Sequence, residues 1–208
     1  MDRPARSPLR AVARFVASVM MVSGALLIAD AGLTLAWQEP VSAFFADRQQ
    51  GQLENALAEP PRRVLRKEPL KGDAVGKLEL PTLGRSYFIV EGTRMGDLRK
   101  GPGHYPKTPL PGQRGTVAVA GHRTTYGAPF RRIDDLRRGD RIVASTPHGR
   151  FVYRVQRVQI VPANAFWVTK RVGYDRLVLT ACHPLHSAKE RIVAFARLER
   201  RERPTVTD

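Results

Sequence analysis

The sequence predicts an all-β domain, a mainly antiparallel sandwich or barrel, that follows one transmembrane helix. Three observations support this fold class. A long apolar run lies near the N-terminus, short runs rich in Val, Ile, Tyr and Phe alternate with Gly and Pro clusters from residue 75 onward, and no long amphipathic helix interrupts them. Seven or eight short strands at close spacing are typical of small barrels and sandwiches.

The N-terminal segment is predicted to be a membrane anchor. From Phe15 to Gln38 the only charged residue is Asp30, and about 20 apolar residues cross the hydrocarbon core as a helix. A cleavable signal peptide has a shorter apolar region, of about 7 to 15 residues. Arginines precede the span, and Trp37 near its C-terminal end is expected at the outer interface. The positive-inside rule therefore predicts a cytoplasmic N-terminus, a single pass and an extracellular main domain.

These features divide the chain into five expected segments. They are a cytoplasmic tail (1–14), the anchor (15–38), a juxtamembrane helix and linker (39–74), the folded domain (75–200) and a C-terminal tail (201–208). The linker ends in a Pro-rich, highly charged run. That composition is unsuited to a core, so we expect it to hold the domain off the membrane.

Strands are expected wherever β-branched and aromatic residues cluster within the folded domain. The expected strands are Gly76 to Leu80, Ser86 to Glu91, Gly115 to Ala120, Asp140 to Ser145, Arg150 to Val161, Arg176 to Ala181 and Arg191 to Leu198. Short helical turns are expected at residues 96–100 and 129–136. Two long loops rich in Gly and Pro, at 100–115 and 123–130, are of a length that is usually functional.

The charge is strongly positive, with 35 Lys and Arg against 19 Asp and Glu, a net charge of +16. Such a charge suggests nucleic acid, an anionic membrane or a wall polymer as a neighbour. The sequence contains no recognition helix, zinc-finger spacing or RNP-type motif, so we expect no nucleic-acid partner. The run RFVYRVQRVQIV alternates apolar and basic residues, which places much of the charge on the wet face of a strand.

The single cysteine, Cys182, is the candidate nucleophile. It ends the apolar run DRLVLTAC and opens the loop HPLHSAKE, so a rigid strand fixes the sulfur while the loop gives access to it. The alternative is that the thiol only packs in the core as a small apolar group. With one cysteine, no internal disulfide can form.

His122 and Arg191 are the candidate partners of this thiol. His122 ends the run GTVAVAGH in the same way, and a thiol needs an imidazole or a positive group beside it to act as a nucleophile. His183 adjoins Cys182, but successive strand residues face opposite sides. Arg191 opens the next strand, and its forked guanidinium suits a developing oxyanion. The other three histidines, His104, His148 and His186, are expected in loops and turns and are weaker candidates.

A zinc site is the competing use of these side chains. Cys182, His122, His183 and His186 are all potential zinc ligands. Their spacing, C-H-x-x-H after the cysteine, matches no structural zinc module. We therefore expect no metal and no cofactor.

These motifs together resemble those of sortases. LVLTACHP followed by ERIVAFARL is similar to the T-[LV]-x-T-C…R signature of the family, and VAGHRTTYGAPF is similar to its histidine segment. The resemblance covers residues 75–200. It is closest to class E enzymes of high-GC Gram-positive bacteria, whose GPGHYP and AGHRTTYG segments recur here. It implies an eight-stranded sortase-type β-barrel and a cysteine transpeptidase, acting through a thioester on sorting signals of the LPXTG kind.

The resemblance also implies roles for individual residues. Cys182 would attack the Thr carbonyl of the Thr-Gly bond, Arg191 would hold the substrate and the oxyanion, and His122 would protonate the leaving amine. A peptidoglycan precursor amine would then resolve the acyl-enzyme. Tyr105 matches a tyrosine associated with Ala in place of Pro at the second signal position (LAXTG), although it can equally well just pack its loop. Substrate-binding residues implied beside it are Thr180 and Ala181, which depart slightly from the common spelling.

Two family features are missing. The segment PANAFWVTKRVGY contains no acidic residue where some sortases place a calcium ligand, which implies no calcium dependence. The linker lacks the Asp-Pro-aromatic lid of pilin-building sortases, which implies wall anchoring of single proteins. Two rival functions stay open: a basic, membrane-tethered module that binds wall polymers, and a sortase-fold protein that acts chiefly as a hydrolase.

Overall fold

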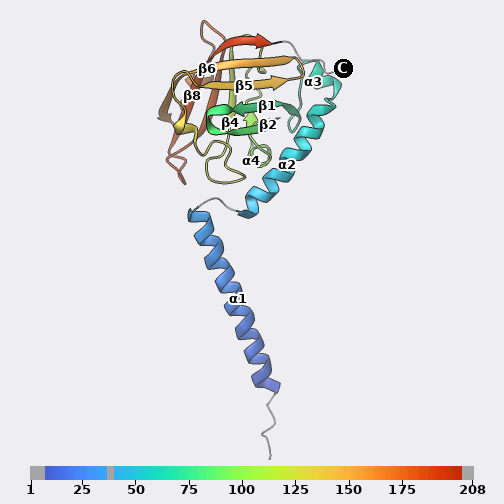
Figure 1. The fold of residues 1–208 in the computed structure, drawn as a ribbon, viewed down its shortest axis with the longest axis vertical. Coiled ribbons are helices and arrows are strands. Elements are labelled where there is room, and N and C mark those ends of the chain that lie inside the picture. Colours follow the sequence, from blue (N-terminus) through green and yellow to red (C-terminus); the bar gives the residue numbers. More distant parts are fainter. Residues whose placement is uncertain (1–7, 37–39, 203–208) are drawn as a thin grey trace, which may run out of the picture. The chain divides into compact units, whose positions relative to one another are not determined.

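The computed structural model describes residues 8–36 and 40–202 and divides at Pro40 into two compact units (Figure 1). The first unit is the helix α1 (Pro8–Ala36). Within α1, the stretch Leu9–Leu33 is apolar and unburied, and it is long enough to cross a membrane. The predicted interfacial Trp37, the first seven residues of the tail and residues 203–208 lie outside the described residues.

The second unit is a closed barrel of eight strands, in the order β1-β2-β3-β4-β7-β8-β6-β5. The strands are β1 (Ala74–Leu80), β2 (Arg85–Glu91), β3 (Gly103–His104), β4 (Thr116–Ala120), β5 (Arg141–Thr146), β6 (Gly149–Pro162), β7 (Arg176–His183) and β8 (Glu190–Glu202). The prediction of an eight-stranded barrel preceded by an apolar helix is confirmed. Each of the seven strands expected from the sequence is present, whereas β3 lies inside a segment expected to be a loop.

Two neighbouring strand pairs are parallel in an otherwise antiparallel barrel. β3 runs parallel to β2, and β4 runs parallel to β7, with register pairs that include Ala118 with Val178 and Ala120 with Thr180. Because β4 and β7 run in the same direction, their C-terminal ends lie at the same end of the barrel. This pairing brings together two loops that are some 60 residues apart in the chain.

The wall made by β4, β7 and β8 has two different apolar faces. Side chains alternate between the faces of a strand, so Leu177 and Leu179 of β7 join the large interior core. Val178 points outward and belongs to a second cluster with Phe195 of β8. Val168, in the short helix η3 (Phe166–Thr169), covers this cluster from outside. The outer face of this wall is therefore partly covered by other residues, and a site can lie on it outside the barrel interior.

One longer helix and several short ones complete the second unit. They are α2 (Pro40–Ala58), α3 (Arg62–Leu65), α4 (Met95–Leu98), η1 (Pro81–Leu83) and η2 (Ile133–Asp135). The helical turns expected at 96–100 and 129–136 correspond to α4 and, in shortened form, to η2.

The sequence predicted a juxtamembrane helix and linker at 39–74, and the structure has the helix α2 at the start of this segment, packed against the barrel (Figure 1). Ala46 and Leu53 are buried, and Leu53 packs with Val90 of β2. Gln50 lies between them on the same helix face and exchanges hydrogen bonds with the backbone of Phe88. The spacing of four and three residues puts these side chains in one stripe. The sequence of α2 is polar on average, yet one face of the helix packs against the barrel.

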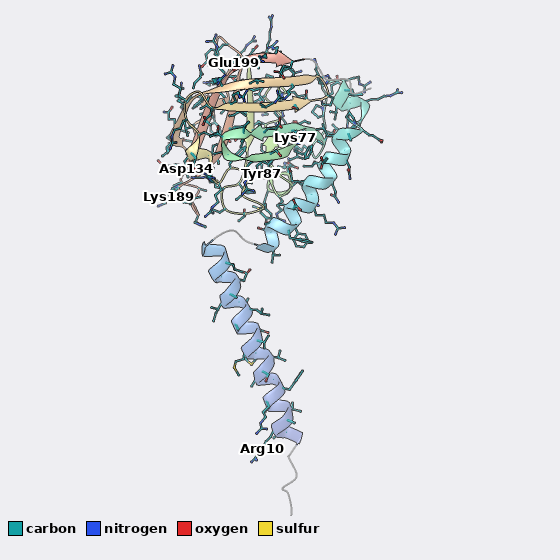
Figure 2. All side chains as sticks on the ribbon, in the orientation of Figure 1. Arg10, Lys77, Tyr87, Asp134, Lys189 and Glu199 are labelled. Carbon is teal, nitrogen blue, oxygen red and sulfur yellow. The ribbon has the colours of Figure 1, made fainter. Side chains whose placement is uncertain are left out.

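Much of the positive charge lies on the barrel surface, where charged side chains of both signs, such as Lys189 and Glu199, project outward (Figure 2). Arg150 and Arg154 of β6 are exposed and pair with Glu202 and Glu199 of β8. These pairs follow the alternation of β6, whose apolar residues face the core. The basic residues of this strand thus form a solvated face, as the sequence predicted.

Candidate active site

Cys182 and Arg191 are direct neighbours across β7 and β8. The two strands are antiparallel and their register pairs these two residues. Directly opposite residues have Cβ atoms about 4.5–5.5 Å apart on the same face of the sheet. Because Val178 of β7 and Val193 of β8 face outward, alternation places Cys182 and Arg191 on the outer face as well. The thiol and the guanidinium therefore share one face at the barrel's end.

His122 reaches the same place from the parallel strand β4. The last register pair joins Ala120 to Thr180, and the amide of Gly121 then donates to the carbonyl of Thr180 at 3.0 Å. His122 follows Ala120 by two residues, as Cys182 follows Thr180. Both side chains line one open pocket. The other residues of its lining are Arg123, Thr124, Pro184, His186, Ser187 and Ala188.

Gly121 lets the chain turn toward this pocket. A Cβ atom at this position would lie 2.5 Å from the ring of Phe130, which is fully buried. The amide of Phe130 also donates to the carbonyl of His122 at 2.9 Å. The glycine before His122 therefore has a steric explanation, and the buried phenylalanine fixes the loop that carries the imidazole.

The surroundings of His122 favour its neutral form. Burial lowers the pKa of the imidazole, and the positive charge of Arg99 lowers it further. Arg99 lies over the ring of Tyr126, whose centroid is 5.2 Å from that of His122. The Nε2 atom is buried and has no hydrogen-bond partner among the described residues. A neutral imidazole with an uncommitted nitrogen can accept a proton and pass it on.

Arg191 is half-exposed at the edge of this site. Its Nη1 group donates to the carbonyls of Ala188 and Glu190, at 2.9 and 2.8 Å. These bonds tie the guanidinium to the loop that follows Cys182. Its backbone position beside Cys182 is set by the strand register, although its side chain is not part of the pocket lining.

Arg123 is a structural residue of this site that the sequence analysis did not single out. Its side chain is almost fully buried. It donates to the carbonyl of Arg131, pairs with Asp134 at 2.9 Å and approaches His183 Nδ1 at 3.2 Å. It thus connects the loop after His122 with the end of β7. Its place directly after the histidine was the only available signal in the sequence.

The implied substrate residues are placed differently from one another. Tyr105 reaches across to β7, where its hydroxyl lies 3.1 Å from Thr180 Oγ1. Thr180 is on the same face as Cys182, two residues before it. The side chain of Ala181 instead packs in the barrel interior, because alternation along β7 turns it away from the outer face. For Ala181 we therefore correct the expectation: its side chain cannot contact a substrate.

The remaining histidines are spread over several settings. His183 is the last residue of β7 and bonds with Arg123, and His186 lines the pocket. His148 lies in the turn between β5 and β6. His104 was expected in a loop, but it lies in β3 and is buried against Glu91. Among residues 8–36 and 40–202, no group of three or more His, Cys, Asp or Glu side chains is placed to hold a metal ion.

The sequence of this chain matches known proteins over the barrel. The sortase domain model matches residues 78–199, more than half of the chain. The chain is 33% identical to sortase D of Bacillus subtilis over 134 residues, which cover 62% of this chain and 66% of that protein. It is 30% identical to sortase SrtE1 of Streptomyces coelicolor, over 96% of this chain and 61% of that protein. The chain thus spans just under two thirds of the length of these relatives.

Solved structures show the same fold. Sortase E from Streptomyces avermitilis is 30% identical and superposes with a TM-score of 0.61, over 67% of this chain and 97% of that one. Sortase E1 from Streptomyces coelicolor, solved with a tripeptide in its active site, is 28% identical with a TM-score of 0.62, over 66% of this chain and 94% of that one. With a matching barrel and a sortase domain model that covers more than half of the chain, this chain belongs to the sortase family.

Proposed function

We propose that this chain is a membrane-anchored cysteine transpeptidase. It cleaves the Thr-Gly bond of a sorting signal of the LAXTG or LPXTG type and transfers the acyl group to a cell-wall amine. The observation that carries the proposal is the register pair of Cys182 and Arg191, with His122 in the pocket that the cysteine lines. Membership of the sortase family supports it.

The first half of the reaction forms a thioester. The sulfur of Cys182 attacks the Thr carbonyl carbon while the thiol proton passes to neutral His122. The carbonyl oxygen becomes an oxyanion, which the guanidinium of Arg191 stabilises. When the C–N bond breaks, the imidazolium gives its proton to the leaving glycine amine. Because burial and Arg99 lower the pKa of His122, the imidazolium gives up its proton more readily at this step.

The second half transfers the acyl group. An amine attacks the thioester carbon, the C–S bond breaks, and the proton lost by the amine returns through His122 to the sulfur. Water in place of the amine would give hydrolysis, so the two activities differ only in which nucleophile reaches the pocket. The acceptor that we propose is an amine of the peptidoglycan precursor.

Tyr105 and Thr180 are proposed to contact the signal near its second position. The tyrosine hydroxyl bonds with Thr180, two residues before the nucleophile, so its ring stands beside the path of a peptide that reaches the sulfur. Sortase E1 from Streptomyces coelicolor, a relative with the same fold, has been solved with a tripeptide in its active site.

The anchor is proposed to place the barrel outside the cell. α1 supplies a candidate span of 25 residues, Leu9–Leu33, and the arginines at its N-terminal end favour a cytoplasmic N-terminus. Sorting-signal proteins and wall precursors would then meet the enzyme on the extracellular side of the cell membrane. This placement follows from charge asymmetry alone.

Cys182→Ala tests the nucleophile. The full chain in detergent micelles should lose all cleavage of a fluorescently labelled LAXTG peptide while its thermal unfolding stays cooperative. Retained turnover would end the proposal. A chain that binds isolated wall polymer, cleaves no peptide and has a thiol inert to a methanethiosulfonate reagent would instead support the binding module.

Arg191→Lys tests the oxyanion role. Lysine keeps the charge but loses the fork, so kcat should fall by about 10²- to 10³-fold, the typical effect of removing one oxyanion donor. Arg197→Lys is the matched control, because Arg197 lies on the same strand and stacks over Tyr174. Equal effects of the two changes would contradict the assignment. Mass spectrometry of products with and without an added amine separates transfer from hydrolysis.

A further inference from the structure

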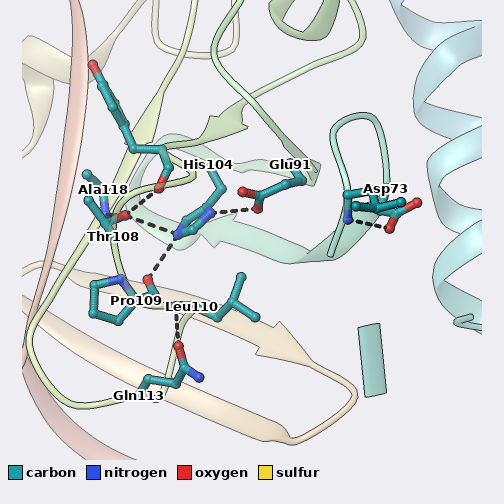
Figure 3. A network of polar contacts seen from close by, with 10 residues as sticks. Asp73, Glu91, His104, Thr108, Pro109, Leu110, Gln113 and Ala118 are labelled. Atoms are coloured by element: carbon teal, nitrogen blue, oxygen red, sulfur yellow. Dashed lines mark hydrogen bonds and ion pairs between the residues drawn. The ribbon is translucent and has the colours of Figure 1, made fainter. Parts of the chain in front are cut away.

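Two buried titratable side chains, His104 and Glu91, take no part in the proposed reaction. They are register partners on the parallel strands β3 and β2. Nδ1 of His104 lies 2.7 Å from Oε2 of Glu91, and only 2% and 5% of the two side chains are exposed. Figure 3 shows the pair and the contacts around it. Groups of this kind are costly to bury unless every polar atom is satisfied.

The partners of the imidazole define its protons. Nε2 lies 2.9 Å from the carbonyl oxygen of Pro109, which only accepts, and 3.1 Å from Oγ1 of Thr108. The Thr108 hydroxyl donates its own proton to the carbonyl of Tyr105 at 2.8 Å. Nε2 must therefore donate, and the contact with Glu91 needs a second proton, on the ring or on the carboxyl.

This pair fixes the turn that carries Tyr105. The ring ties β2 to Thr108 and Pro109 (Figure 3). Thr108 in turn bonds with the carbonyl of Tyr105 through both its hydroxyl and its amide. The Thr108 hydroxyl also accepts from the amide of Ala118 at 3.2 Å, and the amide of Tyr105 donates to the carbonyl of Ala118 at 3.0 Å. Both backbone polar groups of Tyr105 are thus held, one of them through the network around His104.

The side chain of Tyr105 carries this position to the candidate active site. Its hydroxyl reaches Thr180 Oγ1 on β7, on the face of the barrel where Cys182 lies two residues farther on. A displacement of the turn would move the phenol relative to the sulfur. The interior pair is therefore connected to the outer face through one aromatic side chain.

We propose that the His104–Glu91 pair is a positioning device for Tyr105, and that it sets the preference between Ala and Pro at the second position of the sorting signal, a role that rests on the proposed function. His104 and Glu91 act through Tyr105 and do not touch the substrate. Specificity of this kind depends on where a side chain stands as much as on which side chain is present.

The test compares kcat/KM of the full chain in detergent micelles for an LAXTG and an LPXTG peptide. The measured ratio is kcat/KM for the preferred peptide divided by kcat/KM for the other peptide. His104→Leu and Glu91→Leu should each lower this ratio by about fivefold or more, mainly by raising KM for the preferred peptide. Glu91→Gln is the conservative rescue. Its amide can donate to Nδ1 while Nε2 still donates to Pro109, so the ratio should stay within about twofold of the parent. His148→Leu, the same change in a distant turn, should leave the ratio unaltered.

A double variant shows whether the pair acts through Tyr105. His104→Leu added to Tyr105→Phe should change the ratio no further than Tyr105→Phe does alone. A ratio unaltered in His104→Leu, or both peptides slowed equally with no change in KM, would overturn the proposal. Thr108→Val is the milder substitute if the leucine variants do not fold, since it removes only the hydroxyl bonds, and it should shift the ratio in the same direction.

Hydrogen exchange separates this proposal from the function on which it rests. The amides of His104, Tyr105, Lys107 and Thr108 should exchange at least about tenfold faster in His104→Leu than in the parent, whether or not any peptide is cleaved. If the parent cleaves neither peptide, the proposed function fails and exchange still decides whether the pair holds the turn. Unaltered exchange would overturn the positioning role by itself.

Discussion

His122 stands where its charged form is disfavoured, and this sets an expectation for the pH dependence. Because burial and Arg99 lower its pKa, the acid limb of kcat/KM should lie below pH 6.5, the usual value for histidine. Arg99→Gln removes the smaller of the two causes of the lowered pKa. It should shift the acid limb to higher pH, by less than the downward shift that burial produces. The measurement is a pH profile of peptide cleavage.

Arg200→Gln is the control for this profile, because it removes an exposed positive charge on β8 that is not a cause of the His122 shift. A downward shift in Arg99→Gln, or the same shift in both variants, would contradict the electrostatic role of Arg99. The comparison should be made at low ionic strength, since exposed charges are screened by salt.

Gly121 has no room for a methyl group beside Phe130. Gly121→Ala should destabilise the fold by about 1–3 kcal/mol, as overpacking in a core does, and should lower activity further by displacing His122. Gly173→Ala is the matched control, since nothing lies within 4 Å of its added Cβ. Urea unfolding and peptide cleavage check both. Equal stability of the two variants would show that Phe130 yields without strain.

The part of the candidate site that could be predicted from the sequence consists of the residues at strand ends. Cys182, His122 and Arg191 each stand where an apolar run meets a polar loop, and that boundary is visible in the sequence. The placement of Arg99 near His122 is not visible, because it depends on how two loops pack. Ala181 shows the opposite error: it adjoins the nucleophile in sequence, yet alternation turns it into the core.

At the scale of elements, Gln50 joins α2 to β2 by hydrogen bonds, beside the apolar contact of Leu53 with Val90. Gln50 donates to the carbonyls of Phe88 and Lys100 at 3.0 and 2.8 Å and accepts from the amide of Phe88 at 2.7 Å. Gln50→Ala should cost about 1–3 kcal/mol of unfolding free energy, because it leaves these backbone groups without their partner. It should also speed hydrogen exchange at Phe88.

Gln52→Ala makes the same chemical change two residues farther along α2, at an exposed position. It should alter stability by less than about 0.5 kcal/mol. If both variants unfold at the same denaturant concentration as the parent, α2 is not fastened through Gln50, and its packing rests on apolar contacts such as that of Leu53.

Local patterns predicted the long strands well and the tertiary pairings poorly. β6 is predictable because apolar and polar residues alternate over a run of 12 residues. β3 has only two residues and forms because β2 and β4 flank it. The parallel pairing of β4 with β7 leaves no local mark. The packing of α2 was not predicted, because Gln50 lies in the middle of its packed stripe. An apolar residue at this position would have completed a recognisable amphipathic pattern.

At the scale of the whole molecule, the charge asymmetry around α1 predicts which side of the membrane carries the barrel. In a chain with Cys182→Ala and Glu199→Cys, the new thiol lies on a half-exposed strand position (Figure 2). A membrane-impermeant maleimide should label it in intact cells. Labelling only after the cells are opened would reverse the proposed orientation.

The two-sided wall of β7 has a consequence for engineering the enzyme. Interior residues such as Leu177 and Leu179 alternate with outward residues, so one inserted or deleted residue before Cys182 would swap the sulfur with a methyl group of the core. Length changes are therefore confined to the loops beyond the strand ends. Loop exchange between homologues becomes the practical way to redirect the substrate, with the catalytic end of each strand left untouched.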